Sequence, residues 1–206
     1  MSSQAPLLDA VKSRRSYYQL GKKPSISDSK IRGIVEFALL HCPSAFNSQS
    51  TRIVILLNRH HEKLWDIVEE SLGGVVPADQ FDRTKKRIED FRAAYGTILF
   101  FEDIQTTHKL QTTYPSYQDR EPTWAAHTAG MHQLIIWTAL EAEGLGANLQ
   151  HYNPLIDGKV RTEWDILPEW NLNSQLVIGN PMGEPKEKSA KPLEERLKVF
   201  GANKET

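Results

Sequence analysis

The clearest helix pattern in the chain leads, through a short polar segment, into an uninterrupted apolar run. Apolar side chains recur every three or four residues at Ile31, Ile34, Val35, Ala38, Leu39 and Cys42. This spacing predicts a helix with one apolar face, capped at its start by Ser27 and Asp28 and ended by Pro43. The run 53–57 lacks polar alternation and is rich in β-branched residues, so we predict a strand buried on both faces.

The segment between these two elements, residues 43–52, is rich in hydroxyl and amide side chains. A polar loop between two buried elements lies at the edge of a core, where such loops often hold a planar polar ligand. Taken alone, the segment is more simply a solvated connection from helix to strand. Asn47, Ser48 and Gln49 could nevertheless meet the polar edge of a flat ring.

Two more apolar runs, 98–101 and 176–179, predict further buried strands. Periodic or amphipathic segments predict helices at 7–16, 61–72, 79–95, 124–143 and 192–200, and a short helix with a mobile flap at 106–122. Helices outnumber strands and do not alternate strictly with them. We therefore expect an α+β fold or a three-layer arrangement, with a sheet flanked by helices. At 206 residues the chain fits a single domain, 1–206.

The charge balance and the cysteine count exclude several classes of protein. Twenty-five Lys and Arg residues against 26 Asp and Glu leave a net charge of -1, which gives no reason to expect a nucleic-acid or membrane partner. No stretch approaches the roughly 18 apolar residues of a membrane span, and residues 1–9 lack the pattern of a secretory signal. Cys42, the one cysteine, excludes an internal disulfide and is expected to pack in the core. We expect a cytoplasmic protein.

Several familiar chemical motifs are absent. The chain has no G-x-S-x-G nucleophile elbow and no Walker-A lysine motif. Residues 144–146 begin like a dinucleotide fingerprint but follow a predicted helix, so they indicate a helix end. His127 and His132 are five residues apart, and His60 and His61 are adjacent and expected to face solvent. This spacing does not suit a metal, and we expect none.

Two basic clusters could bind an anion. Arg14 and Arg15, flanked by serines in the run 13–16, offer two guanidinium groups and two hydroxyls suited to a phosphate. A weaker cluster near the end of the chain comprises Lys186, Lys188 and Lys191. For both clusters the simpler interpretation is a solvated basic surface.

In combination, these segments resemble the flavin-dependent nitroreductase family. The resemblance rests on the order of Arg14-Arg15-Ser16, then residues 43–49, then residues 144–147. Segments 44–50 and 148–153 are most similar to the compact branch of this family found in yeasts and many bacteria. The resemblance covers nearly the whole chain.

The resemblance implies an α+β fold in three layers, with a central, mostly antiparallel sheet flanked by helices. It also implies an intertwined homodimer with one FMN at each of two subunit interfaces. NADH or NADPH would pass a hydride to flavin N5, and a nitroaromatic or quinone would then take the electrons at the same face. Phe46, Tyr114 and Tyr117 could line an aromatic acceptor pocket, although core packing is an equal alternative for Phe46.

By position, the resemblance assigns the phosphate and ribityl end of FMN to two arginines and their neighbours. Arg14 and Arg15 would bind the phosphate end, with Ser16 close by. Lys188 or Lys191 would complete the phosphate site.

The ring system of FMN is assigned to two other segments. Asn47 and Gln49 would face the isoalloxazine edge of their own subunit's flavin. The neighbouring subunit would contribute Pro43, Ser44 and Ala45. Against the reactive centre, where a backbone N–H is offered to N5, would lie Leu149, Gln150 and His151.

Two positions depart from the family pattern. Many members have a basic residue near the flavin N1/O2 edge, where this chain has Tyr18, whose hydroxyl carries no positive charge. Many also have an acidic residue where this chain has His151. Protons could come from water, Tyr18 or His151, and the sequence assigns no other catalytic residue.

Two other functions stay open at this point. One is a flavin-binding regulatory or redox-sensing protein that keeps the fold with little turnover. The other is a cofactor-free interaction protein that uses the charged helical surface at 79–95.

Overall fold

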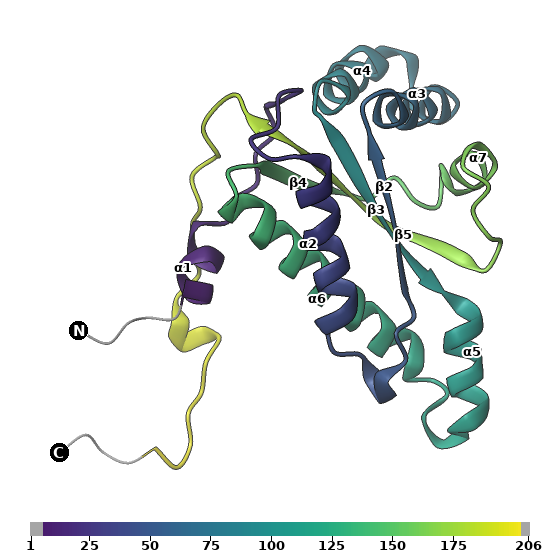
Figure 1. Ribbon diagram of the computed structural model, residues 1–206, viewed down its shortest axis with the longest axis vertical. Helices are drawn as coiled ribbons and strands as arrows, with labels where there is room; N and C mark the ends of the chain where they lie inside the picture. Colours follow the sequence, from purple (N-terminus) through teal and green to yellow (C-terminus); the bar gives the residue numbers. More distant parts are fainter. Residues whose placement is uncertain (1–5, 203–206) are drawn as a thin grey trace.

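The computed structural model describes residues 6–202 and places an antiparallel sheet between two layers of helices (Figure 1). The strands are β1 (Leu20–Gly21), β2 (Thr51–Leu57), β3 (Gly96–Asp103), β4 (Gly146–Gln150) and β5 (Trp170–Pro181). The helices are α1 (Pro6–Ser13), α2 (Asp28–His41), α3 (Arg59–Gly73), α4 (Ala78–Arg92), α5 (Ile104–Thr113), α6 (Glu121–Ala142) and α7 (Asp157–Glu163). Short 3-10 turns lie at Ala45–Asn47, Pro115–Tyr117 and Leu193–Glu195. The expected α+β class is confirmed.

The sheet is organised around β5, which pairs with strands on both of its edges. The order is β1-β5-β3-β2, and β4 also pairs with β5, on the edge away from β3. All four pairings are antiparallel. Before β4, α6 ends and Gly144, with a φ of 89°, turns the chain back into the sheet, as expected for a glycine after a helix.

Each face of the sheet carries its own hydrophobic core. Ile98 and Phe100 of β3 pack with α2 and α6, whereas Leu99 and Phe101 pack with α3, α4 and α7. Because successive side chains of a strand point to opposite faces, this alternation buries β3 on both sides. The prediction of a buried strand at 98–101 is confirmed, as is the cap of α2, where Ser27 accepts a hydrogen bond from the Lys30 N–H.

Two predictions about the burial of apolar residues were wrong. The strand at 53–57 is only partly buried, except for Leu56, because β2 lies at the edge of the sheet with β3 as its paired neighbour. Cys42 is half-buried rather than part of either core. The α-helix ends at His41, and Cys42 is already extended (ψ 129°), so it does not continue the apolar face.

The C-terminal segment also differs from expectation. In place of a helix over 192–200, it forms a single 3-10 turn at Leu193–Glu195. Its apolar side chains are each at least 60% exposed, namely Leu193, Leu197, Val199 and Phe200. A short helix is marginal in water without a packed face, which explains the difference. The predicted absence of a signal at 1–9 lies partly outside the described residues, and among residues 6–202 no helix is long and apolar enough to cross a membrane.

His61 is fully buried, which contradicts the expectation that it faces solvent. Its Nε2 lies 3.1 Å from the Phe91 carbonyl oxygen, so Nε2 carries the proton and donates. Nδ1 then accepts from the Thr97 hydroxyl at 2.8 Å, and the Trp65 indole N–H donates to the same hydroxyl at 3.2 Å. These partners satisfy the buried ring in its neutral form. Burial lowers the pKa of His61 to about 4.

This lowered pKa predicts a loss of stability in mild acid. Below the ordinary histidine pKa of 6.5, His61 is protonated in the unfolded chain. In the folded protein it stays neutral until the pH falls to about 4. His61 alone should reduce the free energy of unfolding by about 2 kcal/mol between pH 7.5 and 5. Urea unfolding of the wild type and His61→Gln at both pH values measures this. An equal loss in the two proteins would contradict the prediction.

Candidate functional site

The segment that carries the paired arginines lies beside β4. Ser16 forms an isolated parallel bridge with Ala147, and the Tyr17 N–H donates to the Ala147 carbonyl at 2.9 Å. The Asn148 side-chain amide donates to the Tyr17 carbonyl at 2.7 Å. Two segments far apart in the sequence therefore form one edge of the molecule.

The two arginines are held in different ways. The Arg14 guanidinium lies 4.3 Å from the centre of the Trp137 ring. Its Nη1 is buried and has no hydrogen-bond partner among residues 6–202. The Arg15 backbone N–H donates to Glu141 Oε2 at 2.8 Å, and its guanidinium donates to the Lys186 carbonyl. A buried guanidinium N–H without an acceptor is a ready ligand for an anion.

The end of β4 brings the predicted reactive-centre residues next to this segment. Leu149 and Gln150 are half-buried, and the Gln150 side-chain amide donates to Asn148 Oδ1 at 2.7 Å. His151 follows directly and is exposed. The Tyr152 N–H donates to Gln175 Oε1 at 2.7 Å, which ties the chain after β4 to the centre of the sheet.

Tyr18 and the C-terminal segment adjoin the same edge. Tyr18 is 43% exposed, and the Lys186 ammonium lies 5.6 Å from the centre of its ring. Among the three lysines of the C-terminal cluster, the structure thus places Lys186 beside the arginines. Lys188 and Lys191 are exposed farther along the chain, and their assignment to a phosphate stays a prediction.

The loop 43–49 lies at the opposite end of α6, where it joins an aromatic cluster. Phe46 stacks on Tyr114 with ring centres 4.4 Å apart and an interplanar angle of 14°. Tyr117 and Trp124 lie 6.4 Å and 5.9 Å from the same ring. With its ring half exposed, Phe46 belongs to an open aromatic surface and not to a core.

The backbone of this loop is strained. Phe46, Asn47 and Gln49 have φ values of 50°, 54° and 50°, in the left-handed region that side chains other than glycine rarely adopt. The Ser44 hydroxyl accepts a hydrogen bond from the Gln49 N–H at 3.0 Å and holds the turn closed. The structure thus keeps Asn47 and Gln49 in the same turn as residues 43–45, although we expected these groups to serve different flavins.

One protomer does not bring the loop to the arginines. The loop contacts Trp124 near the start of α6, and Arg14 contacts Trp137 near its end. Trp137 lies thirteen positions after Trp124, which corresponds to about 20 Å of helix. Figure 1 shows the two regions at opposite ends of α6. Within one chain, the loop and the arginines are therefore two separate groups.

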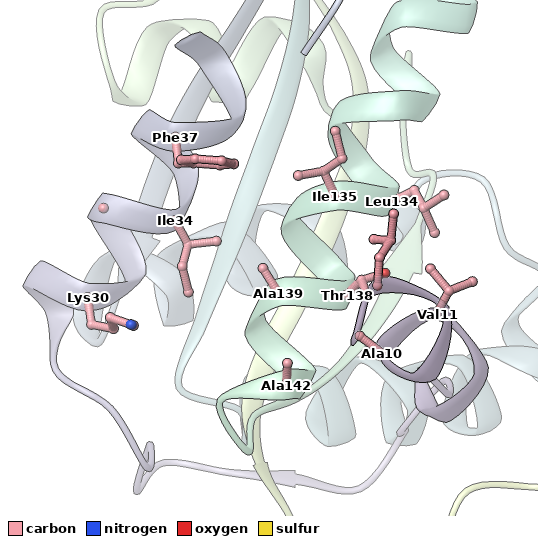
Figure 2. Close-up of a pocket in the computed structure, with 12 residues that line it drawn as sticks. Ala10, Val11, Lys30, Ile34, Phe37, Leu134, Ile135, Thr138, Ala139 and Ala142 are labelled. Atoms are coloured by element: carbon pink, nitrogen blue, oxygen red, sulfur yellow. The ribbon is translucent and has the colours of Figure 1, made fainter. Parts of the chain in front are cut away.

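An apolar groove of about 740 Å³ lies between α1, α2 and α6. In Figure 2, Ile34 and Phe37 of α2 point toward Ile135 of α6 across the groove, and Val11 and Leu134 line its other side. Phe37 is 60% exposed and Leu134 46% exposed. An open apolar surface of this extent is typical of a protein–protein contact.

Sequence reasoning missed Trp137 and Glu141, which contact the arginines. In the sequence they belong to a long apolar helix, and only their spacing of four residues places them on one face. Burial raises the pKa of Glu141, while the N–H groups of Arg15 and Trp137 and the nearby arginine charges oppose that rise.

In the part of the chain that the structure describes, no group of three His, Cys, Asp or Glu residues could hold a metal ion.

Comparisons with known proteins agree on one family. A sequence profile described as the Nitroreductase family matches residues 11–180. The chain is 40% identical over 194 residues to nitroreductase FRM2 of Saccharomyces cerevisiae, covering 92% of this chain and 95% of that protein.

The solved structures point the same way. Nitroreductase CinD from Lactococcus lactis in complex with nicotinic acid has a TM-score of 0.88 at 37% identity, covering 94% of this chain and 99% of CinD. CinD has also been solved with chloramphenicol and with 4-nitrophenol. A protein from Desulfovibrio desulfuricans, solved in complex with FMN, shares the fold with a TM-score of 0.71 at 20% identity, covering 98% of this chain and all of that one.

The strained loop depends on an ion pair at the start of β2. Arg52 Nη2 lies 2.7 Å from Asp103 Oδ2, and Arg52 Nη1 donates to the Gln49 carbonyl at 2.7 Å. Arg52→Ala would leave the mostly buried Asp103 carboxylate unpaired, so we expect a loss of about 2 kcal/mol in urea unfolding and faster proteolysis of the loop. Arg32→Ala, which breaks an exposed pair with Glu36, is the matched control and should cost less than about 0.5 kcal/mol. Equal effects would contradict the prediction.

Proposed function

The chain belongs to the nitroreductase family, and on that basis we propose that it is an FMN-dependent oxidoreductase. Its three-layer fold is nitroreductase-like. When bound, FMN would supply the redox chemistry, accepting a hydride from NADH or NADPH at N5 and giving the electrons to a nitroaromatic or quinone. The CinD complexes support this choice of ligands, because 4-nitrophenol is a nitroaromatic and nicotinic acid has a pyridine ring like that of nicotinamide.

The unpartnered Nη1 of Arg14 is the observation that carries the proposal. Its buried N–H points to an anion as the missing acceptor, and the FMN phosphate has the right charge. Ser16 would add a hydroxyl, and Arg15 a second positive charge. From the C-terminal segment, Lys188 or Lys191 would complete the phosphate site.

We propose that a second copy of the chain completes each site. The aromatic loop lies about 20 Å along α6 from the arginines, so one chain by itself leaves the two groups at opposite ends of the helix. A two-fold dimer packed through the groove, with its two α6 helices antiparallel, would bring the loop of one subunit to the arginines of the other. In this homodimer the whole loop serves the partner's FMN, including Asn47 and Gln49 together with Pro43, Ser44 and Ala45.

The remaining residues would contact different parts of the flavin ring system. Leu149, Gln150 and His151 would lie beside the reactive centre, where a backbone N–H can donate to N5. Tyr18 is exposed two residues after Ser16 and can donate its hydroxyl to the N1/O2 edge. Tyr18, His151 or water would supply protons to the acceptor.

The acceptor pocket would come from the other subunit. The aromatic cluster of Phe46, Tyr114 and Tyr117 offers open ring faces on which a flat acceptor can stack. We further propose that residues 1–206 form one FMN-binding domain and that the protein acts in the cytoplasm.

A visible spectrum followed by anaerobic titration tests the activity. The purified protein should show flavin absorbance that bleaches on addition of NADH or NADPH and returns with 4-nitrophenol or a quinone. Bound FMN without acceptor-dependent oxidation would instead favour a regulatory or redox-sensing protein. A colourless protein that takes up no FMN would reject the enzyme and favour the cofactor-free interaction protein.

The proposed dimer predicts that one substitution in the groove prevents dimerisation and also weakens FMN binding. Leu134→Asp places a charge on a half-exposed groove position, so the protomer should still fold but sediment as a monomer. FMN binding should weaken at least tenfold, because each site would lose the loop of the partner. Leu167→Asp, 52% exposed and outside the groove, is the matched control and should remain dimeric. A Leu134→Asp monomer with unchanged FMN affinity would overturn the composite site.

A further inference from the structure

Trp137 and Glu141, one turn apart on α6, contact the segment that carries Arg14 and Arg15. The Trp137 indole N–H donates to Glu141 Oε1 at 2.6 Å, and Glu141 Oε2 accepts the Arg15 backbone N–H at 2.8 Å. The face of the Trp137 ring carries the Arg14 guanidinium at 4.3 Å. Both carboxylate oxygens and the face of the indole are therefore engaged with this segment or with each other.

These contacts leave Arg14 Nη1 without a hydrogen-bond partner among residues 6–202. A stacked guanidinium uses its flat face, whereas its N–H donors point outward in the plane of the group. A carboxylate beside two arginines would ordinarily form an ion pair with a guanidinium and occupy those donors. Here Glu141 instead accepts a backbone N–H and an indole N–H, so it balances the positive charge nearby without occupying Arg14 Nη1.

We propose that Trp137 and Glu141 are positioning residues that hold Arg14 and Arg15 ready for the phosphate end of the cofactor. This inference rests on the proposed function, which makes the FMN phosphate the anion. An arginine side chain loses rotamer entropy when it is ordered. Holding Arg14 against the indole before the anion arrives removes part of that loss from binding. Neither Trp137 nor Glu141 would touch the cofactor, and a negative Glu141 would not bind an anion itself.

The inference is tested by comparing FMN with riboflavin, which has the same ring system but no phosphate. Trp137→Leu removes the stacking face and Glu141→Ala removes both acceptors, so each should weaken FMN binding about tenfold and leave riboflavin binding unchanged. Trp137→Phe keeps an aromatic face and should restore FMN affinity to within about threefold of the wild type. Fluorescence titration measures the dissociation constants, and circular dichroism confirms that each variant is folded.

Two controls match the substitutions. Trp164→Phe removes an indole N–H that donates to His60, away from the arginines. Glu143→Gln removes an exposed ion pair with Lys30 at the end of the same helix. Both should bind FMN like the wild type.

Each remaining outcome decides the question. Equal weakening of FMN and riboflavin, or no change in FMN affinity in Trp137→Leu and Glu141→Ala, would overturn the positioning role. If the wild type binds no flavin, the proposed function fails, and inorganic phosphate becomes the probe. A rise in Tm with phosphate that is present in the wild type and absent in Trp137→Leu would still support the positioning role. No effect of phosphate on the wild type would reject it.

Discussion

The backbone pairing of β5 is the constraint on which the rest of the structure depends. This strand bonds to β3 along one edge and to β4 and β1 along the other. Because β4 is fixed there, its outer edge is available to the chain around Ser16, which forms a bridge with Ala147. The arginines therefore occupy their place because a strand near the end of the chain orders a segment near its beginning. Removing this pairing would separate the two segments before any side chain of the site was altered.

The length of α6 sets the distance between two groups of candidate site residues. It packs on one face of the sheet, and its two ends support different groups, the aromatic loop at the start and the arginine segment at the end. A helix of 22 residues holds these groups apart. The apolar groove along the same helix leaves large side chains such as Phe37 in water, which favours the proposed dimer.

How far the sequence predicts this structure depends on the kind of signal. The periodic pattern of α2 and the apolar run of β3 predict their elements, because burial of a regular face decides both. The strand β4 escapes prediction, since its small and polar residues form a strand only through pairing with β5. His61 was placed wrongly, because hydrogen bonds to Thr97 and the Phe91 carbonyl, invisible in sequence, permit its burial. The order of motifs pointed to Arg14 and its neighbours. Trp137 and Glu141 can be identified only from the structure, which places α6 against the arginine segment.

The proposed division of each site between two chains has a genetic consequence. In the proposed dimer each cofactor draws its arginines from one chain and its aromatic loop from the other. A chain defective at Arg14 and a chain defective in the loop would each form inactive homodimers. A mixed dimer of the two would combine both defects in one site and leave the other site intact. Two inactive alleles of this gene could therefore complement each other within one assembled molecule, up to half of the normal number of sites per mixed dimer.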